Sequence, residues 1–167
     1  MSTEAWLEGP LEGVDPYLMP IAQALVQVER DLRRLDGLAL EVLWARPGGA
    51  ASVGFHLRHV AGVLDRLTTY ARGETLGEEQ MKALRSEGEP GEPPADAEGL
   101  VREARAAVER ALAQVRATPR EALLEPRGVG RRQLPSNVLG LLHHAAEHAV
   151  RHTGQALTTA KTAGGAA

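Results

Sequence analysis

Hydrophobic residues recur at steps of three and four along most of the chain, the spacing that places side chains on one face of an α-helix. The first such stripe follows Asp15-Pro16, a pair typical of helix starts, and stops at Pro47-Gly48-Gly49. It predicts a helix over residues 16–46. The apolar positions of this stripe are Ile21, Leu25, Val28, Leu32, Leu35, Leu38 and Val42.

The same spacing predicts three further long helices, over residues 52–73, 96–118 and 135–161. A short helix is expected over residues 78–85, before a loop rich in Pro, Gly and Glu at residues 88–94. The inward stripe of the second long helix would consist of Phe55, His59, Val63, Leu67 and Tyr70.

These elements predict one all-α domain spanning residues 1–167, a four-helix bundle with a long connection between its second and third helices. Residues 1–14 read as an N-terminal arm that would pack on the body through Trp6 and Leu7. Residues 119–135 are expected to be an irregular connection without strands. Residues 163–167 read as a frayed tail.

The composition agrees with a helical protein and narrows its function. Aromatic residues make up only 3% of the chain, so Leu, Val and Ala must build the core. A net charge of -3 gives no reason to expect nucleic acid or an anionic membrane as a partner. The N-terminus lacks a basic segment followed by an apolar run, and no apolar stretch reaches the length of a membrane span, so we expect a cytoplasmic protein.

The histidines fall into two short stretches, which suggests one metal site. His148 and His152 are four residues apart and therefore share a helix face, and His59 lies on the predicted inward stripe of the second helix. Three imidazoles on facing helices leave a fourth metal position open for water or substrate. The chain has no cysteine, so metal ligands must come from His, Asp or Glu. Histidines satisfied within a core by a carbonyl or carboxylate are the alternative.

Angles around the predicted helices sort the remaining polar residues. His148 should lie in the middle of the buried face of the last helix, and His143 should lie on its outer face. Glu147 and Asp65 should be surface charges. The candidates for lining a pocket or supporting the ligand rings are His56, His144, Gln155 and Tyr70.

Two segments carry a resemblance to a known family. The segment His148-Ala149-Val150-Arg151-His152-Thr153-Gly154-Gln155 resembles the C-terminal signature of the DinB/YfiT-like four-helix-bundle family, and residues 55–61 look like its second-helix motif. The resemblance implies a divalent metal, zinc, nickel or iron, held by His59, His148 and His152. Arg151 and Thr153 depart from the usual signature, which puts the substrate in doubt more than the metal.

Family members of known activity are similar to metal-dependent transferases and isomerases that use a low-molecular-weight thiol such as bacillithiol, mycothiol or glutathione. The resemblance therefore implies a thiol transferase acting on a small-molecule substrate, and a homodimer formed through the apolar faces of the first two helices. Arg127, Arg131 and Arg132 would either hold carboxylates of the thiol or belong to a solvated loop. The open alternatives are a noncatalytic metal-binding or interaction bundle, and a hydrolase that uses metal-bound water.

Overall fold

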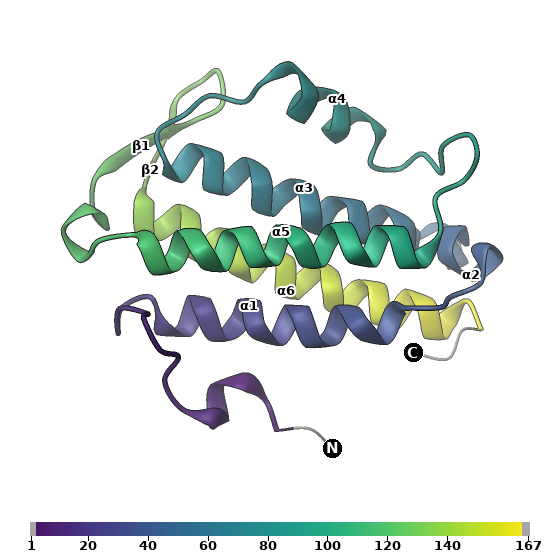
Figure 1. Ribbon diagram of the computed structural model, residues 1–167. Coiled ribbons are helices and arrows are strands. Elements are labelled where there is room, and N and C mark those ends of the chain that lie inside the picture. The colour runs from purple at the N-terminus through teal and green to yellow at the C-terminus, as the bar shows by residue number, and fades with distance from the viewer. Residues whose placement is uncertain (1–2, 165–167) are drawn as a thin grey trace.

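Four long helices form the body of the computed structural model, which describes residues 3–164 (Figure 1). They are α1 (Met19–Leu32), α3 (Val53–Ala71), α5 (Ala97–Ala117) and α6 (Val138–Thr162). Both α1 and α3 contact both α5 and α6. The expectation of an all-α fold is therefore confirmed in its main part.

The number and bounds of the helices differ from the prediction. Two short helices, α2 (Leu40–Trp44) and α4 (Glu78–Ser86), bring the described residues to six α-helices. The predicted helix over residues 16–46 is wrong at both ends. It begins three residues later because Asp15 accepts a hydrogen bond from the Tyr17 amide in a turn, and it breaks near Gly37, whose φ of 72° is left-handed.

The expectation of an irregular segment over residues 119–135 is also wrong. Its second half belongs to an antiparallel hairpin of β1 (Pro126–Val129) and β2 (Leu134–Asn137), in which Arg127 pairs with Ser136. These strands are four residues long and have no buried residue, so they lack the alternation that reveals a strand in sequence. The last helix consequently begins after Asn137, whose side chain accepts a hydrogen bond from the Gly140 amide.

Two other helix starts agree with the prediction. Ser52 accepts a hydrogen bond from the Phe55 amide at the start of α3, and Asp96 accepts one from the Gly99 amide at the start of α5. The remaining regular segments are single 3-10 turns at Ala5–Glu8, Arg33–Leu35, Pro47–Gly49 and Arg120–Ala122.

The core is built from aliphatic residues of the four long helices, as the composition predicted. The arm contacts α1 differently from the expectation: Ala5 is buried, whereas Trp6 and Leu7 are 61% and 57% exposed. The predicted tail is only partly visible, because residues 165–167 lie outside the described part of the chain. Within residues 3–164, no helix is long and apolar enough to cross a membrane.

Candidate metal centre

Histidines of α3 and α6 meet in two pairs where these helices lie side by side. Nε2 of His59 is 2.9 Å from Nε2 of His148, and Nδ1 of His56 is 3.0 Å from Nδ1 of His152. The pairing shows that the helices run antiparallel, because the later residue of α3 meets the earlier residue of α6. Two sequence clusters about 90 positions apart thus become one site.

The three histidines expected to bind metal are brought together. One ring nitrogen from each of His59, His148 and His152 lies within 4.8 Å of the other two, and all three side chains are partly buried. The ring centroids are 4.3 Å apart for His59 and His152 and 4.7 Å apart for His148 and His152. This group could hold a metal ion.

His59 is oriented by a carboxylate that the sequence analysis did not identify. Nδ1 of His59 is 2.7 Å from Oε2 of Glu87, a buried residue that directly follows α4. A carboxylate accepts the proton of Nδ1, which leaves the lone pair of Nε2 facing His148. A carboxylate behind a histidine ring is the usual support of a metal-binding imidazole.

Glu87 is itself held by two arginines. Arg66 donates a hydrogen bond of 2.7 Å to Oε1 of Glu87, and both side chains are buried. Arg58 donates to the carbonyls of Ser86 and Glu89, which fixes the backbone on either side of Glu87. Burial alone would raise the pKa of Glu87, but hydrogen bonds from His59 and Arg66 outweigh it and keep this pKa below its ordinary value.

A glycine makes room for this ion pair. A Cβ atom at Gly62 would lie 2.5 Å from both Nη1 of Arg66 and Oε1 of Glu87. Such a contact is far shorter than van der Waals packing permits, so the pair and a larger residue at position 62 exclude each other. The helical glycine in α3 is therefore explained by the carboxylate that supports His59.

His56 supports His152 in a similar way. With Nδ1 of His152 occupied by His56, the nitrogen of His152 that remains for a metal is Nε2. His56 is only 5% exposed, and the Phe55 ring stacks on His59 at an interplanar angle of 14° and meets His56 edge-on. These contacts limit the rotation of the rings.

The electrostatics suit a cation. Burial, followed by repulsion from His59, lowers the pKa of His56 to about 4. Burial and neighbouring charges, led by that of His59, lower the pKa of His152 to about 4 as well, and the same causes lower that of His148. These rings are therefore neutral near pH 7, the state in which imidazole binds metal.

One ligand ring, His148, is supported less well than the other two. Nδ1 of His148 is buried and has no hydrogen-bond partner among the described residues. With Nε2 of His148 turned toward His59, a metal at Nε2 would leave the proton on Nδ1. The three inward nitrogens thus fit a divalent metal, while His148 lacks the outer support that His59 and His152 have.

A hollow of about 730 Å³ lies beside the histidines at the Phe55 end of α3. His56 and His152 line it, whereas His59 and His148 do not. Gln155, expected near the pocket, is exposed and also lines this hollow. Part of its wall consists of residues with little or no side chain, namely Ala50, Ala51 and Gly154. A substrate could therefore approach His152 from this side.

The remaining polar residues singled out in the sequence are not part of the group formed by His59, His148 and His152. His144 is exposed and stands edge-on to His148, with ring centroids 5.1 Å apart. His143 is exposed, as expected, and exposed Glu147 forms an ion pair with Arg151. His144, Glu147 and His148 form a second group of close ligand atoms, but two of its three members are exposed. Asp65, expected to be a surface charge, is half-buried and accepts a hydrogen bond from Gln80.

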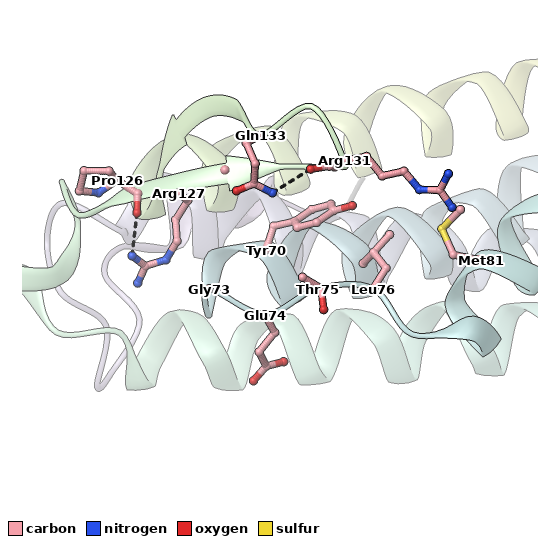
Figure 2. A pocket seen from close by; sticks show the side chains of 12 residues that line it. Tyr70, Gly73, Glu74, Thr75, Leu76, Met81, Pro126, Arg127, Arg131 and Gln133 are labelled. Carbon is pink, nitrogen blue, oxygen red and sulfur yellow. Dashed lines mark hydrogen bonds between the residues drawn. The ribbon is translucent and has the colours of Figure 1, made fainter.

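His148 and Tyr70 lie in positions that differ from the prediction. His148 does not lie in the middle of the buried face of α6; that face is formed by residues such as Ala145, Ala149 and Thr153, and His148 lies at its edge. Tyr70 lines a separate pocket together with Arg127 and Arg131 (Figure 2). Arg132 does not line that pocket.

The sequence offered no signal for Glu87 or Arg66. Glu87 lies in a run of Ser, Gly, Glu and Pro that has the composition of a solvated loop. Arg66 reads as one more charged position on a helix. Only the folding of residues 72–96 back over α3 brings Glu87 to His59 and Arg66, which both lie on α3.

Comparison with known proteins gives a family but no characterised relative. No curated protein matches the chain. The family model described as the DinB superfamily matches residues 24–156, which include all six histidines and the whole of α3. The chain belongs to the DinB superfamily.

Proposed function

We propose that His59, His148 and His152 bind one divalent metal, zinc, nickel or iron, through their Nε2 atoms. The observation that carries this proposal is the 2.9 Å approach of Nε2 of His59 to Nε2 of His148 while Nδ1 of His59 is already bound to Glu87. Two lone pairs that face each other repel unless a proton or a metal ion lies between them. His152 supplies a third ring nitrogen close to these two, which makes a metal the better occupant.

We further propose that the protein is a metal-dependent transferase that uses a low-molecular-weight thiol. A bound divalent metal lowers the pKa of a thiol that coordinates to it, which favours the nucleophilic thiolate. The chain contains no cysteine, so the sulfur would arrive with the cosubstrate. In this proposal the hollow beside His56 and His152 admits the thiol and its electrophilic partner.

The residues of the chain have distinct tasks in this proposal. Glu87 keeps the proton on Nδ1 of His59, and His56 accepts the proton of Nδ1 of His152, so both ligand rings present Nε2 to the metal. Phe55 covers one face of His59 and excludes water from that side. Arg151 and Gln155 lie at the rim of the hollow, where they would contact the substrate rather than the metal.

Metal content is the first test. The purified protein should contain about one equivalent of zinc, nickel or iron by elemental mass spectrometry. The double variant His148→Ala/His152→Ala should contain none, and His143→Ala, which changes an exposed histidine of the same helix, should retain it. A wild-type protein that contains no metal and takes up neither added zinc nor added nickel would refute the proposal.

Thiol chemistry needs a separate test. Cobalt would replace the native metal, and glutathione, bacillithiol and mycothiol would be titrated while the visible spectrum is recorded. A sulfur-to-cobalt charge-transfer band on addition of one thiol, absent with its S-methyl derivative, is the expected result. Turnover of an ester without any thiol, together with no such band, would favour a hydrolase that uses metal-bound water.

The family resemblance also leads us to propose a homodimer. The large apolar side chains of α1 that face α5 and α6 are buried within one chain, so they are not free for a partner. Trp6, Leu7 and Tyr17 are the large hydrophobic residues that stay exposed near α1. A dimer through the first helix would therefore use these residues.

A further inference from the structure

A second cavity lies at the opposite end of α3 from the hollow beside His56. Its volume is about 840 Å³, and it is enclosed by the last turn of α3, the start of α4 and the β1–β2 hairpin (Figure 2). Tyr70 of α3 is 11 residues from His59, which corresponds to about 16 Å along the helix axis. A small ligand in this cavity therefore cannot reach the histidines.

The inner surface of this cavity is largely apolar. Tyr70, Leu76 and Met81 line it from the α3–α4 side, and Pro126 lines it from the hairpin. Figure 2 shows the Tyr70 ring below Gln133, with Leu76 next to it. The cavity size and this lining suit the apolar body of a compact ligand.

One positive charge at the cavity is left without a partner. Arg127 donates to the Ala71 carbonyl and to the Glu125 carboxylate, so its guanidinium is occupied. Glu74, the acidic residue of the lining, is paired with Arg72. Among residues 3–164, the Arg131 side chain has neither a hydrogen bond nor an ion pair, and it extends past Tyr70 toward Met81 (Figure 2).

Arg131 also lines an adjoining hollow with Lys82 and Arg85 of α4. Glu78 and Glu79 line the same hollow, so its five charged residues together carry one excess positive charge. Arginine binds a carboxylate through two parallel hydrogen bonds, which is a geometry that neutral groups cannot reproduce. The mouth of the cavity therefore favours an anion whose apolar part contacts Leu76 and Met81.

We propose that this cavity is a second binding site, which takes a small carboxylate with an aromatic or branched aliphatic body. The carboxylate binds Arg131 and the Tyr70 hydroxyl, and the body contacts Leu76 and Met81. The site is independent of the proposed metal, because none of its lining residues belongs to the histidine centre.

Naphthalene-2-carboxylate is a suitable probe. A ligand of about 13 non-hydrogen atoms should bind with a Kd of about 1 mM or tighter. Titration would be followed by amide shifts in a ¹H–¹⁵N spectrum of metal-free protein, where we expect saturable shifts at Gly73, Gly128 and Gly130 of the lining. The neutral analogue naphthalene-2-carboxamide should bind about tenfold more weakly, because it cannot form the charged pair.

Two arginine variants test whether the carboxylate binds Arg131. Arg131→Gln should weaken the carboxylate about tenfold and leave the carboxamide unchanged. Arg132→Gln, an exposed neighbour that lines neither hollow, should change neither affinity. Equal affinities for the two probes, shifts confined to other regions, or equal effects of the two substitutions would each overturn the proposal. Using metal-free protein keeps this result separate from the outcome of the metal analysis.

Discussion

The carboxylate of Glu87 lies 2.7 Å from Nδ1 of His59, although the two residues are 28 positions apart in the chain. This contact ties the connection after α4 to the candidate metal centre. It also gives His59 a fixed tautomer, which a ligand imidazole needs before an ion arrives. The consequences of removing it are measurable.

Glu87→Gln should lower the affinity for zinc by about 10- to 100-fold, because the amide cannot accept the proton of His59 as a carboxylate does. A competition titration against a chromogenic chelator measures this affinity. Glu89→Gln, an exposed neighbour, should leave the affinity unchanged. Equal zinc affinities for the wild-type protein and Glu87→Gln would show that Glu87 only stabilises the fold.

Gly62→Ala should separate Arg66 from Glu87 and reduce the free energy of unfolding by about 1–3 kcal/mol. Urea denaturation of metal-free protein measures this change. The matched control is Gly154→Ala on α6, where an added Cβ meets no atom within 4 Å. There the helix propensity of alanine should raise stability by about 0.5–1 kcal/mol. Stabilisation at both positions would mean that the ion pair moves aside at no cost.

The stability of the metal-free protein should depend on pH between about 6.5 and about 4. Burial lowers the pKa of His56 and His152 to about 4, whereas these rings titrate near 6.5 in the unfolded chain. Between these values the unfolded chain binds more protons, so the free energy of unfolding falls as the pH falls. Above about pH 6.5 both states are neutral at these rings and this contribution is constant.

Urea midpoints at pH 7.5, 6.0 and 5.0 test this dependence, and all three pH values lie above the ordinary pKa of Glu87, which the fold lowers further. The double variant His56→Gln/His152→Gln should lose most of the slope between pH 7.5 and 5.0. His143→Gln should keep it, because His143 is exposed. An unchanged slope in the double variant would assign the pH dependence to other groups.

Sedimentation velocity tests the proposed dimer. At micromolar concentration the protein should sediment as a dimer, and Trp6→Ser/Leu7→Ser should shift it toward the monomer, because large apolar side chains commonly anchor such interfaces. Leu124→Ser, which changes a still more exposed leucine near the hairpin, should not. A wild-type protein that sediments only as a monomer would refute the dimer.

The periodicity of the sequence predicted the long helices, but it did not predict features that depend on the backbone conformation of single residues or on tertiary contacts. Stripes of Leu, Val and Ala located the long helices, and the spacing of His148 and His152 identified two rings that do lie together. Periodicity did not reveal the break at Gly37, because apolar residues continue on both sides of it. The helix boundary there depends on the left-handed backbone of one glycine.

The hairpin and Glu87 were missed for a related reason. Short strands without a buried residue leave no alternation of apolar and polar residues in the sequence. Glu87 gains its role from Arg58, which binds the backbone around it, and from the space at Gly62. Such contacts between distant segments are set by tertiary packing, and a charged residue within a Gly- and Pro-rich run gives no indication of them.

Helix α4 has no buried residue, and hydrogen bonds from Gln80 to Asp65 and Thr69 attach it to α3. A segment with so little buried surface opens at a lower free energy than the whole protein. Its amide protons should therefore exchange with deuterium faster than those of α3 and α6. Each opening of α4 loosens the backbone that carries Glu87, so His59 would exchange between supported and unsupported states in the folded protein. A bound metal would slow this local exchange, which makes the deuterium uptake of residues 78–87 a sensor of occupancy.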